Sequence, residues 1–280
     1  MRLRPKFSIK FLLLFTTVFS VLVVGWILPS RQQKHFFESK MNDEYGSLES
    51  ISELALWKRI LAYGFGPHSV CNVVEISIEP ESGFDLEDVR RFNDVKELNI
   101  GGGPPVKRGC AAIFQFRQLE ILNFEQSGEL GDVSGFANLE NLTHLALYQS
   151  RFSCGGEFLG ELPKLKTLLI RDSPIDQLQI DGITQSKSVD NLWLSLDGEN
   201  LDLTSLASMK QVTRLGITRH DGWTDLSSVL ELQNLLEFNV DRTYEADLPV
   251  FLELRSRGIR GWYLDRLQEI EKLKRTKPAG

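Results

Sequence analysis

Six side chains in the middle of the chain have the chemical character of a binding surface. They are two arginines, a tryptophan, a tyrosine, a histidine and a leucine: His144, Tyr148, Leu169, Arg171, Trp193 and Arg214. Trp, Tyr and Arg are enriched where a few side chains carry most of the binding energy of an interface. The six therefore predict a patch that binds a protein or a glycan. The alternative is that Trp193 lies flat over its neighbours, or under a loop, and contributes only to packing.

The sequence contains no recognisable catalytic constellation. It has no G-x-S-x-G, H-E-x-x-H or Walker motif, and no nucleophile can be placed beside His144. Cys71, Cys110 and Cys154 form no C-x-x-C pair and have no histidine at ligand spacing, so they are expected to be small buried or turn residues. A Cys110–Cys154 disulfide is the alternative. We expect a protein that is not an enzyme and that has no cofactor and no metal site.

The six side chains lie on a pattern that recurs along most of the chain. Leu142-Thr143-His144-Leu145-Ala146-Leu147 reads L-x-x-L-x-L. Eight further copies begin at apolar residues 22 to 24 positions apart: Val73, Val95, Leu119, Leu165, Val189, Val212, Leu235 and Ile259. A period in this range is typical of a solenoid, in which each repeat stacks on the next. In the ninth copy the pattern predicts that Ile259, Trp262 and Leu264 point into the core.

Over residues 70–264 this pattern resembles that of leucine-rich repeat proteins. The resemblance implies an α/β solenoid of about nine repeats of 22–24 residues, with one short strand per repeat in a parallel sheet on the concave face. Apolar steps of three, as in Val133, Phe136 and Leu139, predict 3₁₀ turns on the convex side. These steps are similar to the short-repeat, internalin-like branch of the family.

The sequence departs from the family at the position that usually holds Asn after each strand. Other residues occupy it, most of them polar: Glu81, Gly103, Ser127, Ser150, Ser173, Asp197, His220 and Thr243. Ser, Thr and Asp can form some of the same hydrogen bonds to backbone groups, so the fold is expected to survive the change.

Strand geometry sends the residues between the apolar positions to the concave face, in three rows. The second row runs in this order: Ser77, Asn99, Asn123, Ala146, Leu169, Trp193, Gly216, Asn239 and Tyr263. His144 and Arg214 belong to the first row, and Tyr148 and Arg171 to the third. Neighbouring strands lie about 4.8 Å apart, so neighbours within a row are expected to touch. Gly216 leaves room for the ring of Trp193.

The beginning of the chain predicts a membrane anchor. Residues 1–10 are basic, and Phe11 to Leu28 is an uncharged run of 18 residues. As a helix this run spans about 27 Å, close to the hydrocarbon core of a bilayer. Residues 29–49 are polar, as in a juxtamembrane linker. The alternative is a cleaved signal peptide, although the run exceeds the usual length and no clean A-x-A site follows.

Helices are expected to cover both ends of the stack. Residues 50–69 begin with the capping box Ser50-Ile51-Ser52-Glu53 and predict an N-terminal capping helix. Residues 265–280 predict a C-terminal capping helix that begins at Asp265 and ends in a basic tail. A further helix is expected from Leu248 to Arg255, whereas residues 175–188 are expected to be irregular.

The charge distribution narrows the class of partner. The first 30 residues hold four basic and no acidic side chains, so the remainder has 28 basic and 38 acidic ones, a net charge of −10. This balance argues against nucleic acid, which requires a concentrated basic surface. A calcium site among Glu237, Asp241 and Asp265 is an alternative use of the acidic ends, but the spacing of a calcium loop is absent.

Residues 7–14 and 56–76 are similar to the leader and entry segment of bacterial, membrane-anchored leucine-rich repeat proteins of unassigned function. This resemblance implies a single-pass protein of the cell membrane with its repeats outside the cytoplasm. We expect its concave face to bind a protein or a glycan. A structural spacer of the envelope and an accessory subunit that positions a separate enzyme are the alternatives.

Overall fold

The structure is a computed structural model, and it describes residues 46–48, 73–78, 92, 94–102, 110–173, 175–196, 201–219, 224–265 and 267–268. The chain divides into two compact units, one of Met1–Ile76 with Ser82–Phe84, the other of Ser77–Glu81 with Asp85–Gly280. The predicted membrane helix at 11–28 and the predicted capping helix at 50–69 lie outside the described residues. Within the described part of the chain, no helix is long and apolar enough to cross a bilayer.

The first unit contains an antiparallel pair of strands. β1 (Gly46–Leu48) pairs with β2 (Val73–Ile78), most of which belongs to this unit, and Gly46 lies opposite Ile76. β2 is the strand predicted for the first repeat. β1 lies within the predicted juxtamembrane linker at 29–49, where no strand was expected. A strand edge offers unpaired backbone groups, which an extended segment of almost any sequence can satisfy.

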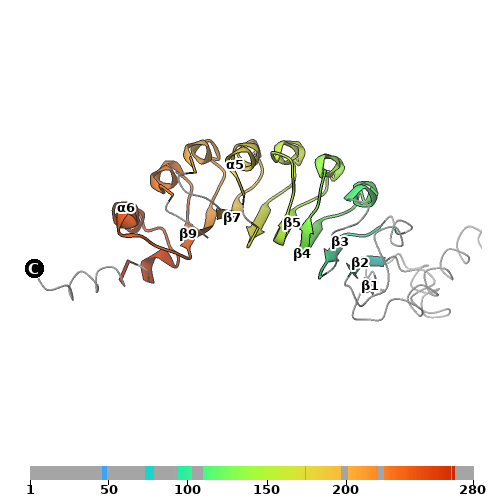
Figure 1. The fold of residues 1–280 in the computed structure, drawn as a ribbon. Coiled ribbons are helices and arrows are strands. Elements are labelled where there is room, and N and C mark those ends of the chain that lie inside the picture. The colour runs from blue at the N-terminus through green and yellow to red at the C-terminus, as the bar shows by residue number, and fades with distance from the viewer. Residues whose placement is uncertain are drawn as a thin grey trace, which may run out of the picture. The chain divides into compact units, whose positions relative to one another are not determined.

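The second unit contains one strand for each of the next seven repeats. In chain order these are β3 (Glu97–Ile100), β4 (Ile121–Glu129), β5 (His144–Arg151), β6 (Thr167–Arg171), β7 (Asn191–Leu196), β8 (Arg214–Arg219) and β9 (Glu237–Val240). Each strand is parallel to the next, and within this unit they line the inner side of an arc (Figure 1). The parallel sheet, its repeat length and its connections are those of a leucine-rich repeat solenoid.

The core lies between this sheet and the outer connections, as the repeat pattern predicts. In β5 and the turn before it, Leu142, Leu145 and Leu147 are at most 1% exposed. The corresponding apolar residues of the other described repeats are buried in the same way: Leu98, Leu119, Leu122, Phe124, Leu165, Leu168, Ile170, Leu192, Leu194, Leu215, Ile217 and Phe238. Burial of this continuous apolar column is the main force that holds successive repeats together.

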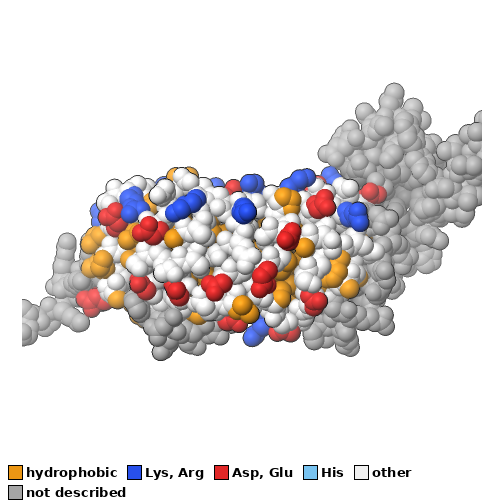
Figure 2. Space-filling view, turned by 90° about the horizontal axis from the view of Figure 1, so that it is seen from above, with side chains coloured by type: hydrophobic (Ala, Val, Ile, Leu, Met, Phe, Trp, Pro, Cys, Tyr) orange, Lys and Arg blue, Asp and Glu red, His pale blue; other side chains and the backbone are white. Residues whose placement is uncertain are grey.

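Short 3₁₀ helices form most of the outer side. They are η5 (Cys110–Gln115), η6 (Ser134–Asn138), η7 (Glu157–Glu161), η8 (Thr204–Ser208), η9 (Ser227–Glu231) and η10 (Glu245–Asp247). The predicted step of three is confirmed, because the amide of Phe136 donates to the carbonyl of Val133 at 2.9 Å. Figure 2 looks onto this side and shows basic side chains gathered along one edge, with acidic ones spread across the helices.

The segment expected to be irregular contains a helix, α5 (Gln177–Ile183). Asp176 caps it and accepts from the amide of Gln179, whose side chain accepts in turn from the amide of Asp176. The D-x-x-Q signal for this capping box is present in the sequence. Gly182 weakens the helix propensity of the residues that follow, because glycine is a poor helix former. It is required here, since a Cβ would lie 1.6 Å from the carbonyl oxygen of Gly155.

Serines at the Asn position form a buried ladder across three repeats. The amide of Ser127 donates to Oγ of Ser150 at 2.9 Å, and the amide of Ser150 donates to Oγ of Ser173 at 2.8 Å. Each hydroxyl donates onward to a backbone carbonyl, for example Ser150 to Tyr148 at 2.9 Å. The hydroxyls thus satisfy backbone groups at the turns, as expected. The residues just before them, Gln126, Gln149 and Asp172, all have φ near +50°.

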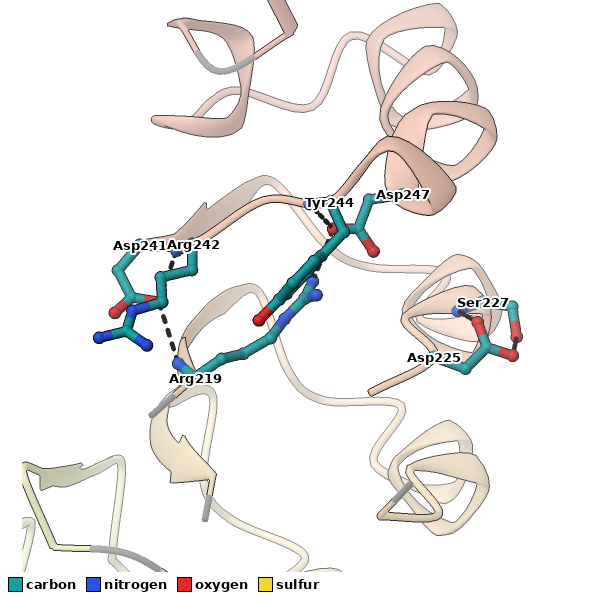
Figure 3. A network of polar contacts seen from close by, with 7 residues as sticks. All are labelled: Arg219, Asp225, Ser227, Asp241, Arg242, Tyr244 and Asp247. Carbon is teal, nitrogen blue, oxygen red and sulfur yellow. Dashed lines mark hydrogen bonds and ion pairs between the residues drawn. The ribbon is translucent and has the colours of Figure 1, made fainter. Parts of the chain in front are cut away.

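Different contacts secure the other end of the sheet, where α6 (Leu248–Ser256) confirms the predicted helix. Arg219 is 1% exposed at the end of β8, and its Nη2 lies 3.1 Å from Oδ2 of the equally buried Asp247 (Figure 3). The guanidinium also lies 5.2 Å from the ring centre of Tyr244. Its Nε and Nη1 are buried without a hydrogen-bond partner in the described structure.

The ninth copy of the pattern does not form a strand. Arg260 makes one parallel bridge to Glu237, and helical residues then begin at 263, so Asp265 lies inside this helical segment and does not cap it. Gly261 adopts φ +145° against the carbonyl of Phe238, which ends the strand alternation. Helical spacing takes over, so Tyr263 and Leu267 are buried while Trp262 is 55% exposed. The prediction that Trp262 points into the core is therefore wrong, and so is the prediction that Tyr263 lies on the concave face.

Two of the three cysteines are described, and both are free. Cys110 is fully buried, and burial raises the pKa of its thiol to about 12. The prediction of a small buried residue is confirmed for Cys110. The alternative Cys110–Cys154 disulfide is not formed.

Candidate functional site

The register of the sheet brings the second-row residues together in the predicted order. Asn123 lies opposite Ala146, Ala146 opposite Leu169, Leu169 opposite Trp193, and Trp193 opposite Gly216. The first row likewise aligns His144 with Thr167 and Arg214 with Glu237, and the third aligns Tyr148 with Arg171. The concave face is therefore an ordered surface on which the positions of the candidate side chains are set by strand pairing.

Trp193 lies at the centre of an aromatic group on this face. The guanidinium carbon of Arg171 lies 3.9 Å from the ring centre of Trp193, within range of a cation–π contact. The ring of Trp262 meets Trp193 edge to face, with centroids 5.7 Å apart. The indole N–H of Trp193 donates to Oγ1 of Thr218 at 3.1 Å. We call Arg171, Trp193 and Trp262 the aromatic shelf.

Gly216 determines how Trp193 lies. A Cβ at this position would come within 2.2 Å of the indole ring, so the ring rests directly on the β8 backbone. Trp193 is therefore packed by Gly216, Arg171 and Trp262. The alternative stated for Trp193, that its ring lies flat over neighbouring residues, describes its position. The accessible aromatic surface of the shelf belongs mainly to Trp262, which is 55% exposed.

Trp262 is the member of the site that sequence reasoning missed. The repeat pattern assigned it to the core, and only the turn at Gly261 brings it to the concave side. Its amide donates to Oδ1 of Asn239 at 2.9 Å, and Nδ2 of Asn239 donates to Oε1 of Glu237 at 2.9 Å. Asn239 is in the second row, and its amide side chain near the end of the sheet was the sequence feature that could have indicated this contact.

Beside the shelf, the concave face contains a polar hollow of about 310 Å³. Nine residues line it: Ser77, Asn99, Ile100, Gly101, Asn123, Glu125, His144, Tyr148 and Leu169. Three of these were predicted site residues, namely His144, Tyr148 and Leu169. Asn99, Asn123 and Glu125 were in the predicted concave rows but were not singled out, because amide and carboxylate side chains are common on solvated faces.

His144 is half-buried at the edge of the hollow. Burial lowers the pKa of its imidazole below the ordinary value of 6.5, and the carboxylate of Glu97 acts in the opposite direction. The neutral imidazole is thus favoured at neutral pH. Among the described residues its ring nitrogens make no hydrogen bond, so this part of the structure places no activated nucleophile beside it.

Arg214 does not join either group. Its Nε lies 3.8 Å from Oε2 of Glu237, and the two side chains are 64% and 40% exposed. Such a surface pair contributes little to stability. The prediction of one patch of six residues is therefore refined: Arg171 and Trp193 form the shelf, His144, Tyr148 and Leu169 line the hollow, and Arg214 stands apart.

The described residues contain no group of three or more His, Cys, Asp or Glu side chains arranged to hold a metal ion. Asp241, one of the carboxylates considered for calcium, accepts instead from the amides of Arg219 at 3.0 Å and Arg242 at 2.7 Å (Figure 3).

Comparisons with known proteins give structural likeness only. No protein-family model matches the sequence, and no curated protein matches it. Among solved structures, an internalin (inlF) from Listeria monocytogenes is 16% identical with a TM-score of 0.48, covering 66% of this chain and 55% of the internalin. The Leptospira interrogans LRR protein LIC12759 is 19% identical with a TM-score of 0.43, covering 60% of this chain and 43% of that one.

The LRR ectodomain of the Arabidopsis receptor kinase HAESA, solved with a peptide hormone ligand, is a third similar structure. It is 17% identical with a TM-score of 0.37, and the match covers 61% of this chain and 30% of that one. The chain thus spans about half the length, or less, of these structures. The assignment of the fold rests on the parallel sheet, its register and its repeat length.

Proposed function

We propose that this protein is a membrane-anchored binding module that holds a protein ligand on its concave face. The observation that carries the proposal is Trp262. A tryptophan exposed over 55% of its surface is unusual, and this one packs against Trp193, whose ring is held in turn by Arg171, so little conformational entropy is lost when a ligand covers it. Rigid aromatic side chains with an arginine beside them are the typical centre of a protein interface.

The chemistry of the concave face favours binding over catalysis. Arg171 and Tyr148 are registered neighbours in the third row, and Trp193 and Leu169 are neighbours in the second, so polar and apolar contacts alternate over a few ångströms. An interface with an apolar centre and a polar rim has this composition. The membrane anchor at Phe11 to Leu28 and the location of the repeats outside the cytoplasm are part of the proposal.

The test is a crosslinking pull-down from membranes with the intact chain and two variants. Trp262→Ala removes the accessible part of the shelf. Leu252→Ala removes a leucine that is 46% exposed on α6 and serves as the matched control. We expect a protein partner that the intact chain and the control capture and that Trp262→Ala loses. Equal capture by all three would reject the concave shelf, and capture of a glycan in place of a protein would reject the protein ligand.

The proposed orientation has a separate test. Single cysteines introduced on the outer side, for example at Lys187 or Lys210, are exposed positions for a membrane-impermeant maleimide. Labelling in intact cells is expected if the repeats lie outside the cytoplasm. Labelling only after lysis would place them inside.

A further inference from the structure

The orientation of two amides on the floor of the polar hollow follows from a single carboxylate. Nδ2 of Asn99 donates to Oε1 of Glu97 at 3.1 Å, and a carboxylate can only accept hydrogen bonds. The carbonyl oxygen of the Asn99 amide must therefore face away from Glu97, where it accepts from Nδ2 of Asn123 at 2.7 Å. The chain of donors fixes the Asn123 amide in turn.

The end of this chain is an acceptor without a donor. Oδ1 of Asn123 is buried and has no hydrogen-bond partner in the described structure. A buried acceptor left unpaired costs free energy, and rotation of the amide would break the bond to Asn99. The floor of the hollow therefore requires a hydrogen-bond donor from outside this set of residues.

The charge of the hollow points the same way. Among the residues that line it, Glu125 is the one that carries a charge at neutral pH, and its carboxylate makes no hydrogen bond or ion pair with any described residue. Arg171 is adjacent in the third row beyond Tyr148, but its guanidinium lies over the ring of Trp193. The hollow thus combines an uncompensated carboxylate with a buried acceptor.

The remaining walls suit a side chain with an apolar stem. Leu169 contributes an aliphatic surface, and Tyr148 contributes an aromatic one. A lysine or arginine side chain brings hydrogen-bond donors and a positive charge but no acceptor, on a stem of methylene groups. A saccharide is neutral, so it would bring no charge to the carboxylate of Glu125.

We infer that the polar hollow receives a lysine or arginine side chain of the protein ligand, with its donors on Asn123 and Glu125 and its stem against Leu169. This inference rests on the proposed function, because it assigns one subsite of the same concave surface. The shelf and the hollow would then contact neighbouring side chains of one ligand, the first through an aromatic ring and the second through a cation.

The inference is tested with small probes on the full chain in detergent, with methyl-labelled leucine observed by NMR. The probes are N-acetyl-arginine methylamide, N-acetyl-lysine methylamide, N-acetyl-glutamine methylamide and methyl β-glucoside. We expect the two basic probes to shift the Leu169 methyl signals at concentrations at least fivefold lower than the two neutral ones. Equal or tighter binding of the glutamine or glucoside probe would overturn the inference.

Charge variants complete the test. Glu125→Gln is expected to lower the affinity for the arginine probe at least fivefold, because a charge-assisted hydrogen bond becomes a neutral one. Glu129→Gln, an exposed position on the same strand outside the hollow, is the control and is expected to change nothing. An unchanged affinity in Glu125→Gln overturns the inference.

The two proposals fail in different ways. If Trp262→Ala loses the protein partner while Glu125→Gln binds the arginine probe as the intact chain does, the binding surface stands and the basic subsite is wrong. If Trp262→Ala retains the partner, the proposed function fails, whatever the probes show.

Discussion

Two regions of the sheet pair backbone amides between repeats with different side-chain groups. At the eighth residue of their repeats, counted from the first leucine, Gln126, Gln149 and Asp172 have φ near +50° and are exposed, and a serine hydroxyl then pairs the backbone between repeats. Arg219 holds the same position three repeats after Gln149, yet its φ is not positive and its side chain is buried. Its amide is paired by the carboxylate of Asp241 at 3.0 Å.

The two regions differ in the side chains that link one repeat to the next. Between like repeats, a small hydroxyl is sufficient because the next repeat supplies an identical partner 23 residues later. At the other end of the sheet the amide of Arg219 is paired by the carboxylate of Asp241, and a buried ion pair joins β8 to the residues before α6. Buried ion pairs are sensitive to the loss of either member, so this end should be the more vulnerable one.

The largest effect is expected when that ion pair is broken. Asp247→Ala leaves the guanidinium of Arg219 buried and unpaired and removes the acceptor for the amide of Tyr244. The free energy of unfolding should fall by about 3–5 kcal/mol. Denaturant unfolding measures it, with Glu253→Ala as control, since the exposed Glu253–Arg257 pair is worth less than about 0.5 kcal/mol. Similar losses in both variants would contradict the contrast between buried and exposed pairs.

A second change probes the support of the shelf. Gly216→Ala places a methyl group in the space occupied by the Trp193 ring, and we expect a loss of about 1–3 kcal/mol from overpacking. The loss should largely disappear when Trp193→Ala is present, because the two residues share one contact. Unfolding of the single and double variants measures this coupling. An additive result would mean that the glycine serves the backbone and not the ring.

The serine ladder should show a smaller loss. Ser150→Ala removes both the acceptor for the amide of Ser127 and a donor to the carbonyl of Tyr148. A loss of about 1–2 kcal/mol is expected, since one buried N–H becomes unsatisfied. Ser134→Ala, at an exposed position of η6, is the control for unfolding measurements. A Ser150 variant as stable as its control would show that water replaces the hydroxyl.

The smallest effect concerns pH. Because burial lowers the pKa of His144, the folded state binds a proton at this site less readily than the unfolded state. The associated stability is complete above the ordinary value of 6.5 and is lost as the pH falls from there through the lower pKa of the folded protein. His144→Gln should flatten this part of the stability curve, measured by unfolding between pH 7.5 and pH 5. If His144→Gln leaves the pH dependence of stability unchanged, that dependence arises from other titratable groups.

The repeat itself could be read from the sequence. Eight of the nine apolar triplets, at intervals of 22 to 24 residues, determined the strands, the register and the rows of the concave face, because strand alternation and constant connection length leave few other arrangements. The role of the serines followed from their hydroxyl chemistry. Five of the six predicted site residues accordingly lie in the shelf or the hollow.

Tertiary structure decided what happens where the pattern weakens. The choice between Trp262 and Tyr263 as the buried residue depends on the φ of Gly261 and on its approach to Phe238, neither of which residue types reveal. The unpaired acceptor of Asn123 depends on a hydrogen-bond chain that begins at Glu97, two positions before Asn99. The burial of Arg219 requires a carboxylate 28 residues further along. Such contacts join residues with no fixed spacing, and so only the folded chain determines them.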